Sequence, residues 1–301
     1  MADTHKTEYQ LKMLMKYNRD GSPDRQRARF QNLTRCINHL QQNRGYGKRY
    51  KLEKFGRKEV SRLVNDWKEQ KLSHRTIANR MVDIRWMASK HGHAERIPSN
   101  KDIGLALRKN MANHGIDKSA PLDSGKLEQL DQREQLITQL RHEFGLRTAE
   151  ACKFSHAFAT KDSPESISLK GSWCKGGRPR TIPIVNDTQR QLLSQIQAHQ
   201  DTNSEKSMIP KNQSFKAYYR DYNEARHALG IAGHGLRHKW AQNRFEELSG
   251  GIKCPLAGGT EYASLSPAEK AAWNKAAGQV NQELGHGQGR QDITSTYIGA
   301  R

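Results

Sequence analysis

Apolar residues recur at helical spacing along most of the chain, and they alternate with polar residues over only two short stretches. Early in the chain, Phe30, Leu33, Ile37 and Leu40 mark one face of a helix that ends near Gly45. The same spacing predicts further helices at residues 60–67 and 77–87, with Gly92 ending the second, and a shorter element at 103–111. This part of the chain is therefore predicted to be a small helical bundle.

Helical spacing also dominates the second half. Helices are predicted at 127–144, 188–200 and 214–229, from residue 235 with Leu236 and Trp240 on one face, and from a capping box at Ser266 to Gly285. The two alternating stretches, residues 166–169 and 181–185, flank a Lys175-Gly-Gly-Arg-Pro turn, which predicts a hairpin with Lys175 at its tip. The predicted fold class is mainly α with a small antiparallel sheet.

Composition divides the chain into parts. Residues 112–125 combine two glycines and a proline with small polar residues, which is typical of a linker. Residues 1–20 are polar and basic and are predicted to form a basic arm. The predicted parts are 1–20 (arm), 21–112 (helical bundle), 113–125 (linker) and 126–301 (second domain, with an inserted loop at 251–265).

Charge points to a polyanionic partner. The formal net charge is +20, and residues 1–118 carry 27 Lys and Arg against 12 Asp and Glu. Within this part, the connector after the first long helix interleaves Tyr46 and Tyr50 with cations, a mixture that suits contact with DNA phosphate and sugar. A solvated basic loop is the alternative. The candidate DNA-binding residues are Arg44, Lys48, Arg49 and Lys51.

Cysteine spacing and hydropathy bear on the compartment. The four cysteines show no C-x-x-C spacing, which favours reduced thiols over a disulfide framework or a zinc knuckle. No apolar run is long enough to span a bilayer, and the N-terminus lacks the apolar core of a signal peptide. We expect a cytoplasmic protein that does not contact membranes.

Candidate chemistry begins with His234 and Arg237, at the start of a predicted helix. One turn apart, their side chains would project into the same space and offer an imidazole and a planar fork of N–H donors to a phosphate diester. Further polar residues stand before and after this pair. The ordered set is Arg147, Lys175, His234, Arg237, His286 and Tyr297.

In this order the residues resemble the motifs of the tyrosine recombinase (phage integrase) family. The matching phrases are Gly-Leu-Arg147-x-x-Glu150, Lys175-Gly-Gly-Arg before Thr-Ile-Pro, His234-x-Leu-Arg237-His, Leu-Gly-His286 and Tyr297. The resemblance covers residues 126–301, and the N-terminal bundle is similar to the family's core-binding domain in topology. It implies a two-domain clamp around DNA.

The resemblance also implies a role for each residue. Arg147 and Arg237 would hold the phosphate, His234 would assist proton transfer, and His286 would donate to the phosphate. Lys175 would protonate the departing 5′ oxygen, with Lys170 or Arg178 as alternatives, and Tyr297 would become a 3′-phosphotyrosyl ester. A free phenol has a pKa near 10, so it needs such help at neutral pH.

Three alternatives to these assignments stay open. Tyr262 competes with Tyr297 as the nucleophile, but it lies before the Leu-Gly-His phrase and so out of the family's order. His286 alone could be a helix-end histidine stabilised by the helix dipole. A zinc site of His234, His238 and His286 would lack the usual Cys pair or His-Glu-x-x-His phrase.

The expected function is site-specific cutting and rejoining of duplex DNA, for integration or excision of a mobile element, without a cofactor or metal. Partners would be duplex DNA, three further copies in a homotetramer on paired sites, and DNA-bending accessory proteins, in a bacterial or phage-derived nucleoid setting. The alternatives are a type IB topoisomerase-like relaxer and a non-catalytic DNA-binding regulator on the same fold.

Two departures from the family pattern concern assembly. Only four residues follow Tyr297, too few for a stable exchanged helix between protomers. The inserted loop, with Pro255, Leu256, Tyr262 and Leu265 as apolar anchors, is expected to supply the contact between protomers instead. The alternative is a loop folded back on its own domain.

Overall fold

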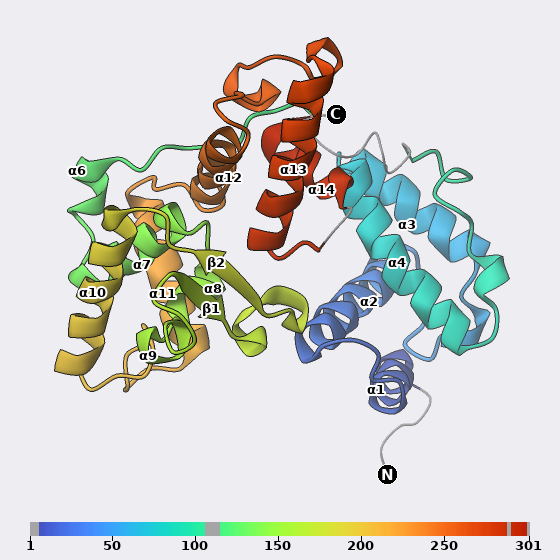
Figure 1. The fold of residues 1–301 in the computed structure, drawn as a ribbon. Coiled ribbons are helices and arrows are strands. Elements are labelled where there is room, and N and C mark those ends of the chain that lie inside the picture. The colour runs from blue at the N-terminus through green and yellow to red at the C-terminus, as the bar shows by residue number, and fades with distance from the viewer. Residues whose placement is uncertain (1–5, 106–114, 288–289, 300–301) are drawn as a thin grey trace. The chain divides into compact units, whose positions relative to one another are not determined.

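The computed structural model describes residues 6–105, 115–287 and 290–299. The chain divides into two compact units, Met1–Ala112 and Asn113–Arg301, shown in Figure 1. Each unit has its own apolar core, and the second unit adds a small satellite cluster around Leu236. The two units are therefore described separately.

Unit 1 is a bundle in which α2 contacts α1, α3 and α4. Ser22 and Ser73 cap α2 and α4 through their hydroxyl groups, as expected for residues before a helix. The predicted element at 103–111 lies largely outside the described residues. The elements are α1 (Thr7–Tyr17), α2 (Pro23–Asn43), η1 (Leu52–Lys54), α3 (Arg57–Glu69), α4 (His74–Lys90) and η2 (Ala94–Arg96).

The arm predicted at residues 1–20 is wrong over most of its length, because Thr7–Tyr17 forms the helix α1. Leu11 is fully buried against the bundle. The backbone N–H of Thr7 donates to the carbonyl of Lys48 at 3.0 Å, and its hydroxyl donates to the carbonyl of Tyr50 at 2.8 Å. A basic segment can fold here because its few apolar residues find a tertiary partner.

Unit 2 is also mostly helical. The helix predicted at 127–144 is broken, because Asp131 caps a new helix and accepts from Glu134 N. The first elements are α6 (Ser124–Leu127), α7 (Gln132–Glu143), α8 (Thr148–Cys152), α9 (His156–Ala159), β1 (Ser166–Leu169), η3 (Gly171–Trp173), η4 (Lys175–Gly177), β2 (Arg180–Pro183) and α10 (Asp187–Thr202). The remaining elements are α11 (Phe215–Ala228), α12 (Gly235–Leu248), η5 (Pro255–Ala257), η6 (Tyr262–Ser264), α13 (Pro267–Glu283) and α14 (Gln291–Ile298).

The sheet is a two-stranded hairpin. β1 pairs antiparallel with β2, with Ser166 opposite Pro183 and Leu169 opposite Arg180. Ile167, Leu169 and Ile182 point into the core, which accounts for the alternation in the sequence. The prediction of a mainly α fold with a small antiparallel sheet is confirmed.

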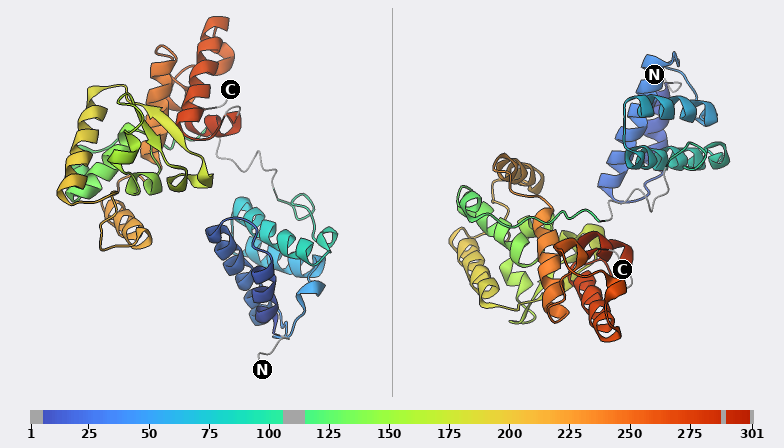
Figure 2. Two further views of the ribbon diagram at one scale, coloured as in Figure 1. Left: turned by 60° about the horizontal axis from the view of Figure 1, so that its bottom comes forward. Right: turned by 90° about the horizontal axis from the view of Figure 1, so that it is seen from above.

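Helices α12, α13 and α14 contact one another, as Figures 1 and 2 show in brown to red. The 251–265 insert lies between α12 and α13 in the sequence, and its apolar residues pack onto the core of unit 2. This arrangement is the folded-back alternative rather than the protomer contact that we expected. Among the described helices, none is long and apolar enough to cross a membrane.

Candidate active site

The first part of the site is the start of α8. Gly145 has a φ of +60°, and a Cβ there would lie 2.5 Å from Trp240 of α12, so a glycine is needed for both reasons. The turn places Arg147 before the helix, where its backbone N–H and its Nη1 each donate to Glu150 at 2.8 Å. Glu150 therefore orients Arg147.

The second part is the start of α12. The loop before it is held by two arginines: Arg141 donates to the carbonyl of Gly233, and Arg226 donates to the carbonyl of Ile231 at 3.1 Å. His234 precedes the helix, and Arg237 lies in its first turn. His234 thus projects from a loop whose backbone is held by the buried Arg141 and the half-buried Arg226, and Arg237 projects from the helix that follows.

The third part is Tyr297 on α14, which meets the start of α12. The Tyr297 hydroxyl lies 3.2 Å from Nε2 of His234 and 3.4 Å from Nε of Arg237. Its side chain is buried, and its ring lies 5.7 Å from the His286 ring between centroids. Tyr262, the competing tyrosine, instead packs its ring edge on Trp273 at 5.7 Å.

Arg237 is 1% exposed and is held by main-chain carbonyls. Its Nη1 donates to Gly145 O, and its Nη2 donates to Leu284 O at 2.6 Å. With the contact to Tyr297, each of its three nitrogens makes one hydrogen bond. Because a guanidinium carries five N–H donors, Nη1 and Nη2 each keep one for a further acceptor. Burial lowers its pKa to about 10, so it stays charged at neutral pH.

Glu150 connects these cations. It is 0% exposed, and Arg180 of β2 donates to both of its oxygens, at 3.0 and 2.7 Å. Burial alone would raise the pKa of Glu150, but Arg180, then Arg237 and Arg147, lower it to about 2. Arg180 also donates to Glu283 O at 2.7 Å, and so links the hairpin to the end of α13.

The histidines are kept neutral. Burial and the charges of Arg237 and Arg147 lower the pKa of His286 to about 3. The pKa of His234 is also lowered, by desolvation and by Arg237 and His238, although this side chain retains solvent exposure and water moderates the effect. A neutral imidazole can accept a proton from a nearby hydroxyl.

His286 and Lys175 differ in how firmly they are placed. His286 follows Gly285, whose φ is +73°, and its backbone N–H donates to Asn281 O at 2.9 Å. Its buried Nε2 has no hydrogen-bond partner in the described part of the chain. Lys175 is exposed in η4 and precedes two glycines with positive φ. The hairpin tip thus carries the lysine on a segment that is open to solvent.

The two alternatives to Lys175 lie elsewhere on the hairpin. Lys170 has its Nζ 5.7 Å from the centroid of the Phe158 ring. The Arg178 guanidinium lies 3.8 Å from the Cβ position of Gly287, next to His286. Arg178 is therefore the alternative that lies nearer to the other site residues.

The candidate DNA-binding residues lie in unit 1, between α2 and η1. All four are exposed; Arg44 also donates through Nε to Asp66 at 3.2 Å, and Lys51 lies 3.8 Å from Glu53. Tyr46 and Tyr50 pack against the core of unit 1 with their rings 5.0 Å apart, and the Tyr46 hydroxyl donates to Glu59 at 2.8 Å. Both tyrosines are half-buried, so part of each side chain is used in the packing of unit 1, and contact of this connector with DNA stays a prediction.

Sequence reasoning missed several positioning residues. Arg180 shares its strand face with Ile182, and a charge on an inward face was an available signal. Arg141 gave no local signal, because the carbonyl of Gly233 that it contacts is far away in the sequence. Arg226 contacts the carbonyl of Ile231, which is only five residues further on. The predicted linker also contacts α12: Ala120 N donates to Gly235 O at 3.2 Å.

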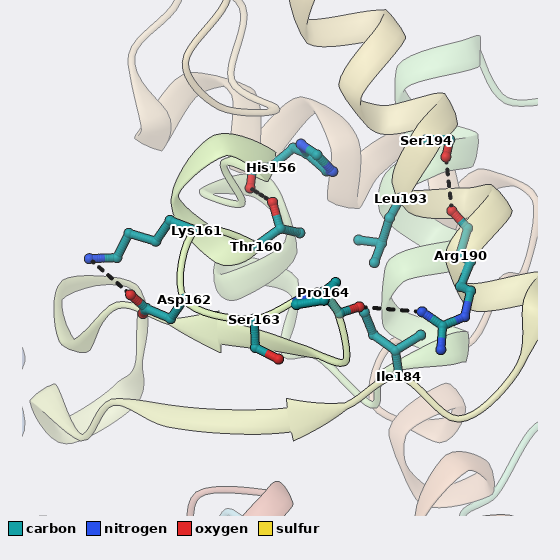
Figure 3. Close-up of a pocket in the computed structure, with 10 residues that line it drawn as sticks. All are labelled: His156, Thr160, Lys161, Asp162, Ser163, Pro164, Ile184, Arg190, Leu193 and Ser194. Atoms are coloured by element: carbon teal, nitrogen blue, oxygen red, sulfur yellow. Dashed lines mark hydrogen bonds and ion pairs between the residues drawn. The ribbon is translucent and has the colours of Figure 1, made fainter.

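Two other features lie outside this set. The described residues contain no group of three or more His, Cys, Asp or Glu side chains placed to hold a metal ion, and this holds for His234, His238 and His286. A cavity of about 470 Å³ lies between α9, the loop after it and α10, lined by residues such as His156, Lys161 and Arg190 (Figure 3). None of the site residues lines it.

Family models of known proteins match two parts of the chain. A family model described as "Integrase" matches residues 121–243, and one described as "Phage integrase, N-terminal" matches residues 4–97. Among curated proteins, no sequence matches the chain.

Solved structures match nearly the whole chain. A lambda integrase dimer bound to a COC′ core site aligns with a TM-score of 0.56 at 14% identity, over 97% of this chain and 77% of that chain. The Tn1549 transposon integrase in complex with circular intermediate DNA aligns with a TM-score of 0.56 at 13% identity, over 98% and 96%. At such low identity these matches establish the fold.

Proposed function

The chain belongs to the tyrosine recombinase (phage integrase) family, and we propose that it cuts and rejoins duplex DNA at specific sites through a bond between Tyr297 and a 3′-phosphate. The observation that carries the proposal is the place of the Tyr297 hydroxyl, 3.2 Å from His234 Nε2 and 3.4 Å from Arg237 Nε. A phenol beside a proton acceptor and a buried guanidinium is arranged for attack on a phosphodiester.

The scissile phosphate would bind between three cationic or donor groups. Arg147 and Arg237 would donate to its non-bridging oxygens. Nη1 and Nη2 of Arg237 each keep one N–H group for this purpose. The unpartnered Nε2 of His286 would supply a further hydrogen bond. Such donors stabilise the charge that develops as phosphorus becomes five-coordinate.

The proton balance uses two residues. As the bond between Tyr297 Oη and phosphorus forms, the phenol proton passes to neutral His234. As the bond to the 5′ oxygen breaks, Lys175 protonates that oxygen. Because the phosphotyrosyl ester retains the free energy of the broken bond, a second strand can be joined without ATP.

The basic unit 1 would supply much of the grip on the duplex, through exposed side chains such as Lys48 and Arg49. Together the two units would close around DNA as a clamp. We further propose that four copies assemble on two paired sites and that the reaction integrates or excises a mobile element.

Trapping on a nicked suicide duplex tests the proposal. The wild-type chain should form a covalent adduct that mass spectrometry maps to Tyr297, while Tyr297→Phe should bind the same DNA and form none. An adduct that persists in Tyr297→Phe would refute the assignment. DNA binding without any adduct would instead favour the non-catalytic regulator.

A plasmid assay separates the remaining alternative. Recombination needs two copies of the site, whereas relaxation needs none. We expect product only from plasmids that carry paired target sites. Relaxation of any supercoiled plasmid, without recombinant product, would favour the topoisomerase-like alternative.

A further inference from the structure

The 251–265 insert contains a closed turn. The carbonyl of Cys254 accepts from Ala257 N at 2.9 Å and from Gly259 N at 3.0 Å. A Cβ at Gly259 would collide with the carbonyl of Lys253, so the chain passes too close to itself for a larger residue. The turn that contains η5 is therefore a compact element with a defined shape.

The insert is fastened to its own unit at both ends. Cys254 and Leu265 are 1% and 7% exposed and belong to the core of unit 2. Between them, the Tyr262 hydroxyl accepts from Asn274 of α13 at 3.2 Å. The apolar residues that suggested a contact between protomers are thus used within the chain.

The residues directly after Tyr297 lie against this turn. Ile298 is 1% exposed and shares an apolar cluster with Leu256. Gly299 has a φ of +103°, and a Cβ there would lie 3.0 Å from Cβ of Pro255 and 3.3 Å from its Cγ. From the other side, Gln242 of α12 donates to the carbonyl of Tyr297 at 3.4 Å.

This contact matters because α14 cannot set its own position. The helix has eight residues and no side-chain cap at its start, and so short a helix is not stable by itself. Its place is decided by α12, α13 and η5, which it contacts. Tyr297 lies one residue from the C-terminal end of this helix, next to the contact with η5.

Resting on the function proposed above, we propose that the η5 turn of the insert anchors the nucleophile helix α14 and so sets the position of Tyr297. Pro255 and Gly299 are positioning residues, which act by placing the phenol beside His234.

Gly299→Ala tests the anchor. The added methyl group meets Pro255, so α14 must move. Gly250→Ala is the matched control, since Gly250 also has a positive φ of +75° but open space around its Cβ position. On a nicked suicide substrate at saturating DNA, we expect Gly299→Ala to slow adduct formation by at least about tenfold, part of the roughly 100-fold that a full 1 Å misplacement costs. Gly250→Ala should stay within twofold of wild type, and both should bind DNA as wild type does.

A second change separates the specific contact from general damage. Pro255→Gly removes the atoms that the methyl group added by Gly299→Ala would meet. The variant that carries both Pro255→Gly and Gly299→Ala should form the adduct at least about tenfold faster than Gly299→Ala alone. Pro255→Gly alone should form it more slowly than wild type. No recovery in the double variant, or a wild-type rate in Gly299→Ala, would overturn the proposal.

Hydrogen exchange without DNA tests the anchor independently of catalysis. Amides of residues 293–299 should exchange at least about tenfold faster in Gly299→Ala than in wild type, since local opening becomes easier. Unchanged exchange would overturn the anchor even if the wild type cuts DNA. Faster exchange in a protein that forms no Tyr297 adduct would uphold the anchor and count against the proposed function.

Discussion

Glu150 and Arg180 form a buried, bidentate ion pair that ties α8 to the hairpin strand β2, with N–O distances of 3.0 and 2.7 Å. The same carboxylate holds Arg147, and the same guanidinium holds the carbonyl of Glu283. Two residues that never contact the substrate in the proposed reaction thus set the spacing of those that do.

Removal of one partner from this pair should cost both stability and rate. We expect Arg180→Met to lower the free energy of unfolding by about 3–5 kcal/mol, because a buried carboxylate loses its main partner. The unfolding free energy of Arg180→Lys should lie between those of wild type and Arg180→Met, since lysine keeps the charge but loses the paired geometry. Urea unfolding measures the loss of stability in both variants, and adduct formation on the suicide substrate measures the loss of rate.

Arg190→Met is the matched control for Arg180→Met. Its pair with Glu165 has a similar distance, 2.7 Å, but both side chains are exposed, so its loss should cost at most about 1 kcal/mol. Equal losses at the two positions would contradict the role of burial.

The carboxylate of Glu150 should make stability depend on acid pH. Its pKa is lowered to about 2 in the folded chain, against about 4.3 for a free glutamate. Its contribution is therefore complete above about pH 4.3 and is lost as the pH falls from there toward 2. The difference in unfolding free energy between wild type and Glu150→Gln should be large at pH 6 and shrink by pH 3. A constant difference would show that the ion pair is not its source.

Gly145→Ala should damage the site through packing. The new Cβ would lie 2.5 Å from Trp240 at a φ of +60°, so Trp240 and α12 must shift. Overpacking of this kind costs about 1–3 kcal/mol, and the shift also displaces Arg237. We expect a lower melting temperature and slower adduct formation than in Gly250→Ala, which has positive φ without the clash. Matching behaviour of the two variants would assign the effect to backbone strain alone.

Salt dependence should separate the candidate DNA-binding residues. Lys48→Ala and Arg49→Ala should each reduce the slope of log Kd against log salt by about 0.9, the value for one phosphate contact. Arg44→Ala should act mainly on stability, because Arg44 is paired with Asp66. Fluorescence anisotropy across a salt series measures the slopes. Unchanged slopes in the first two variants would remove this connector from the interface.

Chelation tests the metal-free chemistry that we expect. Guanidinium groups can stabilise the charge on the phosphate without a divalent ion. Adduct formation on the suicide substrate should therefore continue in EDTA at the wild-type rate. Loss of the adduct in EDTA and its return with Mg²⁺ would point to a metal-assisted mechanism.

The sequence by itself determined the parts whose signal is local. Helical spacing located α2, α3, α4, α10 and α11, and a period of two located the hairpin, because side-chain direction follows directly from backbone geometry. The phrases around Arg147, His234 and Tyr297 indicated the proposed chemistry, because attack on a phosphodiester restricts the residue types that can perform it. The resemblance to the family rested on these residue types and their order.

Only the tertiary structure decided which partner each side chain takes. The apolar residues of the insert and of α1 indicated that these segments contact something, but apolar burial is non-directional and does not name its partner. Tyr46 and Tyr50 are half-buried against the core of unit 1 for the same reason. Arg141 and Arg180 became positioning residues only when folding brought the carbonyl of Gly233 and the carboxylate of Glu150 within reach. A hydrogen bond acts over about 3 Å, so its partners are set by the fold and not by nearness in the sequence.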